Sequence, residues 1–260
     1  MITRTVTIGN DFTVNRIGLG TNRICENEQS KEALLKAVEL GINFIDTAAA
    51  YTSGESEVTI GKTLHPYPQG LIIATKGGMT PPNFSVDGRT ETLEKQLEKS
   101  LEALKVEAID LYFLHRVDPN VPFEEQMAFL KKAKEEGKVK HIGLSEVSVD
   151  QIVEARKITE ITAVENEYNL LERKHDDVLD YCEQEGIAFI PFYPLKTSST
   201  EVLEELAGKY GKTQQQIILA WLLKRSPITL PIPGSLSAKH LEENIAALDI
   251  ELSEEDYALL

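Results

Sequence analysis

Residues 41–51, GINFIDTAAAY, contain a short apolar run, Asn43–Asp46, that lies between a glycine and a string of small and polar residues. Similar runs recur along the chain, and amphipathic helical patterns lie between them. Short, nearly continuous apolar strands that alternate with helices are typical of a parallel sheet covered by helices. The predicted strands are Asn43–Asp46 together with Arg16–Leu19, Leu71–Thr75, Leu111–Leu114, His141–Leu144, Ala163–Asn166, Ala188–Pro191 and Thr229–Ile232. The predicted helices include Lys31–Leu40, Thr90–Leu104, Phe123–Glu136, Asp150–Ile158, His175–Glu185 and Thr213–Lys224.

The number of repeats decides between a closed and an open sheet. Eight strand–helix repeats joined by right-handed crossovers can close into a (β/α)8 barrel, and about 250 residues commonly form one such domain. We therefore predict an α/β fold with eight parallel strands, in a single domain that spans residues 1–260. Thr3–Ile8 and Phe12–Asn15 flank a Gly-Asn-Asp turn, which predicts a β-hairpin before the first barrel strand.

The alternative architecture is an open, doubly wound sheet that binds a dinucleotide through its glycine-rich first turn. The early glycine pair is Gly18-Leu19-Gly20, but Thr-Asn-Arg follows it in place of the remaining glycine. No acidic residue follows at the appropriate strand end, so the closed barrel is the better prediction.

Composition excludes several classes of protein. A net charge of −15 is opposite in sign to that of a nucleic-acid-binding protein. The chain has no run of about 18 apolar residues, as a membrane span would need, and Met1–Thr5 does not resemble a signal peptide. Cys25 and Cys182 lack the spacing of metal ligands, so we expect no metal site and a reducing, cytoplasmic location.

Ionisable side chains follow three consecutive predicted strands, at the barrel end where active sites lie. Asp46 and Tyr51 follow the second strand, Lys76 the third and His115 the fourth. We expect the Lys76 ammonium to lower the pKa of Tyr51 and Asp46 to hold Lys76 charged. His115 can orient a substrate carbonyl toward Tyr51, so the group suits protonation of an oxygen as hydride reaches the adjacent carbon. Each residue alone has an ordinary structural explanation, but their joint placement does not.

These residues lie in segments that resemble the aldo-keto reductase family. The likeness starts with residues 41–51 and Ser56-Glu57, and continues through the blocks around Lys76 and His115. It persists in order to the end of the chain, in Gly143–Ser145, Glu167–Arg173, Leu230–Ser235 and His240–Asn244. The resemblance implies NAD(P)H-dependent reduction of aldehydes or ketones, with Asp46, Tyr51, Lys76 and His115 as the catalytic residues.

The resemblance also implies an extended cofactor across the barrel mouth. The residues around the nicotinamide and its ribose would be Gly20, Thr21, Asn22, Ser145, Glu146, Glu165 and the stacking ring of Phe192, with Tyr193 as the alternative ring. Those along the phosphates would be Pro194, Leu195, Gly234, Ser235, Lys239 and His240, and those at the adenine Glu243 and Asn244.

The sequence departs from the family pattern at four of these positions. Glu146 and Glu165 stand where many relatives have Asn and Gln, and a carboxylate cannot donate a hydrogen bond unless it is protonated. We expect Glu165→Gln to leave cofactor affinity unchanged or improved. Gly234 and His240 stand where many NADP-binding relatives have a basic residue and an arginine. NADP(H) is the expected cofactor, with NAD(H) as the alternative.

The substrate is a small carbonyl compound that the sequence does not specify. The short Val117–Pro122 loop and a C-terminal segment that stops at Leu260 imply an open site, near Ile24, Tyr51 and Met79. We expect a monomer or small homo-oligomer.

Two other functions remain open: a nicotinamide-nucleotide sensor or regulatory subunit with little turnover, and an isomerase or aldolase that forms a Schiff base at Lys76.

Overall fold

The core of the fold is one parallel sheet. The computed structural model describes residues 3–198 and 200–260, so Met1 and Ile2 of the predicted N-terminal segment lie outside it. Within these ranges, seven parallel strands form a sheet in the order β11-β10-β9-β8-β5-β4-β3. Their bounds are β3 (Leu19–Gly20), β4 (Phe44–Asp46), β5 (Ile72–Gly77), β8 (Ile109–Leu114), β9 (Val139–Ser145), β10 (Ala163–Glu167) and β11 (Ala188–Phe192).

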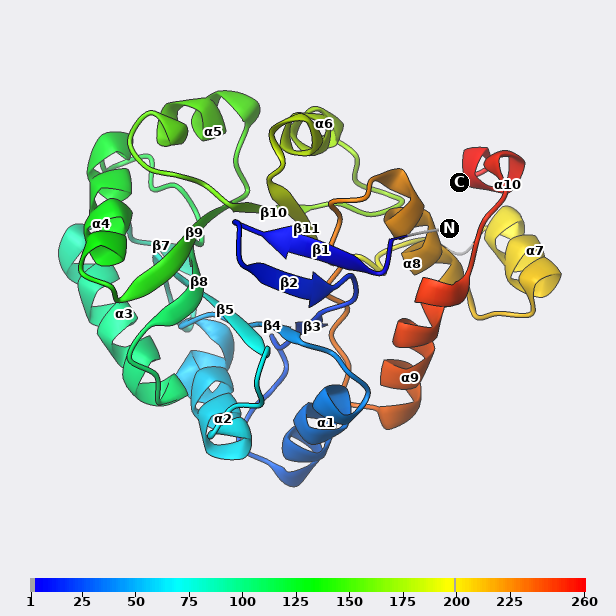
Figure 1. Cartoon of the computed structure of the whole chain (residues 1–260), viewed down its shortest axis with the longest axis horizontal. Coiled ribbons are helices and arrows are strands. Elements are labelled where there is room, and N and C mark those ends of the chain that lie inside the picture. Colours follow the sequence, from blue (N-terminus) through cyan, green and yellow to red (C-terminus); the bar gives the residue numbers. More distant parts are fainter. Residues whose placement is uncertain (1–2, 199) are drawn as a thin grey trace.

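Helices surround the sheet on its outer side, as Figure 1 shows. The helix that follows each strand packs its apolar face on the strands and leaves its charged face in solvent. Thr213 caps α8 in a reciprocal capping box, and Gly186 ends α6 in the left-handed conformation. The helices are α1 (Glu28–Glu39), α2 (Glu55–Leu64), α3 (Thr90–Leu104), α4 (Phe123–Glu135), α5 (Val149–Arg156), α6 (Asp176–Glu185), α7 (Glu201–Tyr210), α8 (Gln214–Arg225), α9 (Ala238–Ala246) and α10 (Glu254–Ala258).

The predicted eighth strand, Thr229–Ile232, closes the barrel without forming a regular ladder. Its bridge partner is Phe189 of β11, to which Leu230 donates a backbone hydrogen bond of 2.8 Å. On its other side, Gly18 donates to the carbonyl of Pro231 at 3.0 Å. Pro231 and Pro233 have no N–H to donate, which is why this segment does not continue as a strand. The two edges of the sheet still meet through it, and the open doubly wound alternative is therefore wrong.

The predicted hairpin, β1 (Thr5–Ile8) and β2 (Phe12–Asn15), covers the N-terminal end of the barrel (Figure 1). Val6, Ile8 and Val14 are buried in the same apolar cluster as side chains from inside the barrel. That end of the barrel interior is therefore filled, and the open end is the one where the strands terminate.

Some elements were not predicted from the sequence. Helices α2 and α7 lie where no helix was expected, and β6 (Met79–Thr80) and β7 (Ser85–Val86) form a two-stranded hairpin beyond β5. The hairpin brings Met79 and Phe84 to the rim of the open end.

The buried side chain of Arg16 forms hydrogen bonds with residues 229–232, the segment that closes the barrel, and with the end of the preceding helix α8. Its guanidinium donates to the carbonyls of Thr229 (3.0 Å), Leu223 (2.8 Å) and Ser226, and burial lowers its pKa to about 10. We expect Arg16→Leu to lower the free energy of unfolding by about 2–4 kcal/mol, because buried carbonyls lose their donors. Urea denaturation measures the change. The matched control is Arg4→Leu, which removes an exposed arginine paired with Asp249; an equal loss in both variants would contradict this account.

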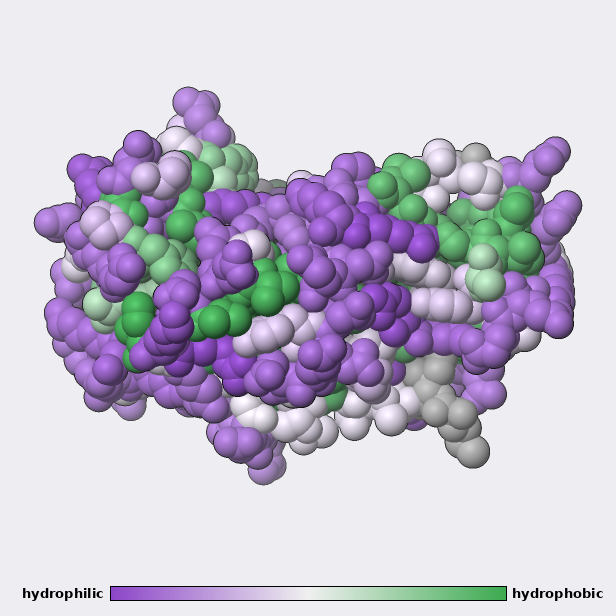
Figure 2. Space-filling model, turned by 90° about the horizontal axis from the view of Figure 1, so that it is seen from above, coloured by the Kyte–Doolittle hydropathy of each residue, from purple (hydrophilic) through white to green (hydrophobic). Residues whose placement is uncertain are grey.

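The face of the molecule shown in Figure 2 is mostly hydrophilic. On the face shown in Figure 2, hydrophobic residues gather in separate groups among hydrophilic ones. Among residues 3–198 and 200–260, no helix is both long and apolar enough to cross a membrane. Cys25 and Cys182 are free thiols.

Candidate active site

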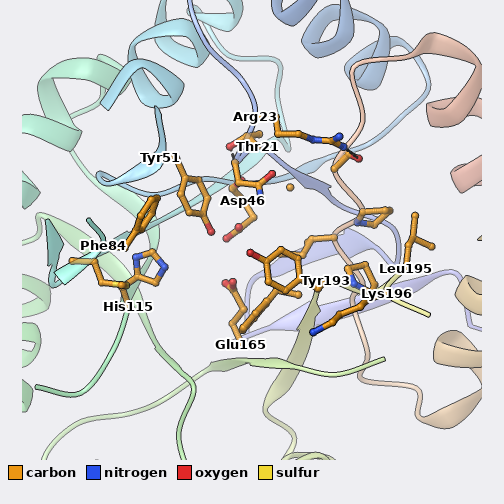
Figure 3. A pocket seen from close by; sticks show the side chains of 18 of the residues that line it. Thr21, Arg23, Asp46, Tyr51, Phe84, His115, Glu165, Tyr193, Leu195 and Lys196 are labelled. Carbon is orange, nitrogen blue, oxygen red and sulfur yellow. Dashed lines mark hydrogen bonds between the residues drawn. The ribbon is translucent and has the colours of Figure 1, made fainter. Parts of the chain in front are cut away.

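A cavity of about 970 Å³ opens at the C-terminal ends of the strands. Figure 3 shows that Tyr51, Asp46 and Glu165 point into the same central space, with Arg23 and Lys196 at its rim. The cavity is lined by Gly20, Thr21, Asn22, Arg23, Asp46, Tyr51, Met79, Phe84, His115, Arg116, Glu165, Phe192, Tyr193, Pro194, Leu195, Lys196, Ile232, Pro233 and Gly234.

Asp46 and Lys76 form a buried ion pair beneath the cavity. The Lys76 Nζ lies 2.6 Å from both carboxylate oxygens of Asp46 and donates to the carbonyl of Thr47 at 3.0 Å. The same ammonium lies 3.4 Å from the hydroxyl of Tyr51. The structure thus brings together three of the four residues proposed for catalysis by direct polar contact.

Tyr51 reaches this position through a strained turn. It begins the 3-10 turn η1 (Tyr51–Gly54), in which Thr52 and Ser53 have φ angles of 46° and 58°. Left-handed backbone is costly for a β-branched residue, and such strain often marks functional sites. The Thr52 hydroxyl donates to the carbonyl of Ile24 at 2.8 Å, which holds the turn in place.

The pKa of Lys76 shifts in the direction that the sequence predicts, whereas the pKa of Tyr51 does not. Burial opposes the charge of Lys76, but the carboxylates of Asp46 and Glu165 outweigh it and raise the pKa of Lys76 above its ordinary value. Burial also raises the pKa of Tyr51, and Lys76 offsets this only in part because the carboxylates oppose it. The expected lowering of the Tyr51 pKa is therefore wrong, and Tyr51 keeps its proton at neutral pH.

The protonated state of Lys76 also bears on the Schiff-base alternative. A lysine attacks a carbonyl only as the neutral amine, and both carboxylates favour its charged form. The pair geometry therefore favours a structural and electrostatic role for Lys76 over a nucleophilic one.

His115 stands beside Tyr51 at the end of β8. The two rings make an edge-to-face contact with centroids 5.8 Å apart. Burial, together with the charges of Lys76 and Arg116, holds the pKa of His115 well below its ordinary value. A neutral imidazole can donate one hydrogen bond to a carbonyl oxygen without competing for the proton of Tyr51.

Glu165 adds a second carboxyl to the ion pair. Its Oε2 lies 3.3 Å from the Lys76 Nζ, and its backbone pairs with Ser145 of β9 on one side and Ile190 of β11 on the other. Burial and the neighbouring charge of Asp46 raise the pKa of Glu165 to about 8.

Arg116 occupies the space between two residues that were predicted to hold a nicotinamide. Its guanidinium donates to the Ser145 Oγ at 2.8 Å and lies 5.5 Å from the centre of the Phe192 ring. Arg116 thus contacts both the Phe192 ring and the Ser145 hydroxyl in this structure.

The remaining predicted residues divide into two sets. The structure brings Gly20, Thr21, Asn22, Glu165, Phe192, Pro194, Leu195 and Gly234 together in the cavity wall, as it does Asp46, Tyr51 and His115. Ser145, Glu146, Ser235, Lys239, His240, Glu243 and Asn244 are not in that wall.

The outlying residues are held by other contacts. The Glu146 carboxylate accepts from the backbone N–H of Glu167 at 2.5 Å, and lies 3.5 Å from Lys174 and 3.6 Å from His175. The structure therefore does not bring Glu146 into the cavity wall, where the sequence placed it beside the nicotinamide. Ser235, Lys239, His240, Glu243 and Asn244 lie before or along α9, in continuation of Gly234; Ser237 caps this helix.

Sequence reasoning missed the cations around the cavity. Arg23 donates to the carbonyl of Gly234 at 2.8 Å, and Lys196 pairs with Glu167 at 2.8 Å. Both follow residues that were singled out, Asn22 and Leu195, so proximity in the chain was the available signal. Phe84 enters through the unpredicted hairpin β6–β7, and its sequence context gave no signal.

Comparison with known proteins defines the class of this barrel. The Aldo/keto reductase family matches residues 16–260, nearly the whole chain. The chain belongs to the aldo/keto reductase family and is an oxidoreductase.

Individual relatives extend the likeness along the full length. An uncharacterized oxidoreductase of Schizosaccharomyces pombe is 43% identical over 98% of this chain and 88% of its own length. The pyridoxine 4-dehydrogenase of Escherichia coli is 36% identical over 98% of this chain and 96% of its own. The crystal structure of an aldo-keto reductase from Klebsiella pneumoniae in complex with NADPH has a TM-score of 0.86 and 26% identity, and the match covers 100% of this chain and 94% of that one.

Proposed function

We propose that this enzyme reduces aldehydes or ketones to alcohols with NADPH, and that Tyr51 donates the proton. The observation that carries the proposal is the contact of the Tyr51 hydroxyl with a lysine–aspartate pair at the floor of an open cavity. The bound cofactor supplies a hydride to the carbonyl carbon, and the carbonyl oxygen takes the proton of Tyr51.

The side chains around Tyr51 have separate roles in the reaction. Neutral His115 donates a hydrogen bond to the carbonyl oxygen and directs it toward the Tyr51 hydroxyl. Lys76 stabilises the tyrosinate that forms when the proton leaves, and Asp46 fixes the ammonium in place. The proton then returns to Tyr51 from solvent through the open cavity.

The cavity suits an extended, phosphate-bearing nucleotide. Arg23, Arg116 and Lys196 line it and offer positive charge to a diphosphate, against a net charge of −15 for the whole chain. The ring of Phe192 offers a face for the nicotinamide. Glu165 and the carbonyl side of Asn22 offer acceptors for the carboxamide NH2 and the ribose hydroxyls.

NADPH is preferred over NADH in this proposal. Ser235, Lys239 and His240 lie before and in the first turn of α9, where backbone N–H groups and positive charge favour a 2′-phosphate. Glu243 and Asn244, one turn further, would then lie near the adenine. The NADPH complex of the Klebsiella pneumoniae relative supports this choice.

Cofactor oxidation with a panel of aldehydes tests the proposed function. Purified enzyme is titrated with NADPH and NADH by fluorescence, and turnover is then followed with aliphatic aldehydes, aromatic aldehydes and pyridoxal. Pyridoxal is included because a relative is a pyridoxine 4-dehydrogenase. We expect tighter binding of NADPH than of NADH and turnover of at least one aldehyde. Tight NADPH binding with no turnover of any carbonyl would favour the sensor over the enzyme.

A further inference from the structure

Glu165 is a buried carboxyl with an unsatisfied oxygen at the cavity wall. The residue is 2% exposed, and among residues 3–198 and 200–260 its Oε2 has no hydrogen-bond partner. The Lys76 Nζ forms an ion pair with this oxygen at 3.3 Å, while its closer contacts are with Asp46 and Thr47. Figure 3 shows the Glu165 carboxyl turned toward Asp46 and the centre of the cavity.

The charges around Glu165 do not balance when it is ionised. Asp46 of β4 and Glu165 of β10 face the single ammonium of Lys76 from β5, with the neutral hydroxyl of Tyr51 and neutral His115 beside them. Arg116, Lys196 and Arg23 also line the cavity, but the charges that act on the pKa of Glu165 are those of Asp46 and Lys76. An ionised Glu165 therefore leaves the floor of the site one negative charge in excess.

The place of Glu165 determines what can compensate this charge. Its register neighbour on β9 is Ser145, and β11 on its other side ends at Phe192. Ser145 was placed above among the residues around the nicotinamide, and Phe192 as the ring that stacks on it. A nicotinamide ring in that place is cationic when oxidised and neutral when reduced.

We propose that Glu165 makes this cavity favour the oxidised cofactor over the reduced one, because its carboxylate supplies the counter-charge of the oxidised nicotinamide ring. This inference rests on the proposed function, since it requires the nicotinamide to bind at Phe192. A glutamine in the same place has no charge and cannot discriminate between the two redox states by this means.

The preference depends on pH through the proton of Glu165. Burial and Asp46 raise the pKa of Glu165 to about 8, so the carboxyl is mainly protonated at pH 6.5 and mainly ionised at pH 9. A cation beside it lowers that pKa, so NADP⁺ binding expels the proton, whereas NADPH binding does not. The affinity for NADP⁺ relative to NADPH therefore rises with pH across this range.

The test measures binding and proton release, without turnover. NADP⁺ and NADPH are titrated into wild type by isothermal calorimetry at pH 6.5, 8 and 9, in pairs of buffers that differ in ionisation enthalpy. The same titrations are made on Glu165→Gln and on Glu160→Gln. Glu160 is an exposed partner of Lys134, so its substitution makes the same change in net charge away from the cavity. The shared 2′-phosphate and adenine cancel in the comparison of the two redox forms.

In wild type, the NADP⁺-to-NADPH affinity ratio is expected to rise roughly tenfold between pH 6.5 and pH 9. NADP⁺ binding at pH 8 should release up to about half a proton more than NADPH binding. Glu165→Gln should abolish both effects and Glu160→Gln should retain them. The unchanged or improved cofactor affinity expected for Glu165→Gln then applies to NADPH alone.

Two results would overturn the inference, and they are distinguishable. If both cofactors bind wild type but the ratio is the same at every pH, the charge of Glu165 does not act on the ring, and the proposed function stands. If neither cofactor binds, the proposed function fails and the inference fails with it. The wild-type titrations decide between these results even if Glu165→Gln does not fold.

Discussion

Replacing Tyr51 with phenylalanine is expected to lower kcat/KM for aldehyde reduction by roughly 10²–10⁴-fold, the usual contribution of a general acid. The substitution removes one hydroxyl and keeps the ring that contacts His115. The affinity for NADPH should change little, because the hydroxyl contacts the Lys76 ammonium and not a residue of the proposed phosphate site. Steady-state kinetics and a fluorescence titration measure the two quantities.

The matched control for this variant is Tyr193→Phe. Tyr193 also lines the cavity, but it is 55% exposed and follows β11, whereas Tyr51 follows β4. We expect its loss of hydroxyl to leave kcat within a few-fold of wild type. Full activity in Tyr51→Phe would refute the proton-donor role, whatever the behaviour of Tyr193→Phe.

Replacing Lys76 with methionine is expected to reduce both stability and activity. The variant leaves Asp46 and Glu165 buried, at 1% and 2% exposure, without a cation between them. Removing one partner of a buried ion pair typically costs about 3–5 kcal/mol. Activity should fall as well, because no ammonium remains to stabilise the tyrosinate of Tyr51.

The stability loss in Lys76→Met should grow with pH. The pKa values of Asp46 and Glu165 are already raised by burial in wild type, and losing the ammonium raises them further. A carboxyl whose folded pKa exceeds its unfolded value favours the folded state below the unfolded pKa, and that contribution is lost as pH rises through the folded pKa. Urea denaturation at pH 6 and pH 9 measures this, with the exposed Lys157→Met as control. An equal loss at both pH values would show that the carboxyls do not carry the effect.

The parts of the fold that could be predicted are those in which short-range pattern and long-range packing agree. The strands around residues 43–46 and 111–114 have apolar centres because both of their faces are buried, and this is visible in a single sequence. The strand predicted at residues 229–232 has the right burial, but it contains Pro231 and is followed by Pro233. The hydrogen bonds it fails to make depend on N–H donors that these prolines lack. The hairpin β6–β7 depends on pairing of two-residue strands, which leaves no periodic signal.

The candidate site likewise contains features that the sequence predicts and features that it does not. Asp46, Lys76 and His115 were predictable because parallel strands end at one edge of the sheet. The direction of the Tyr51 pKa was not, because it depends on how far Asp46 and Glu165 cancel the charge of Lys76 at distances of a few ångströms. The position of Arg116 between Ser145 and Phe192 depends on a side-chain conformation, which no spacing in the sequence specifies.

The irregular closure at residues 228–233 has a consequence for how cofactor preference can change. This segment is joined to its neighbours by separate backbone hydrogen bonds rather than a regular ladder, and the buried guanidinium of Arg16 adds a bond to the carbonyl of Thr229. Gly234, Ser235 and the first turn of α9 follow directly from it. Substitutions in residues 233–240 can therefore alter the phosphate pocket while the seven regular strands keep their register. The preference for one of the two dinucleotides can therefore change through a short stretch of the chain. Such changes should have little effect on the stability of the barrel that holds the catalytic residues.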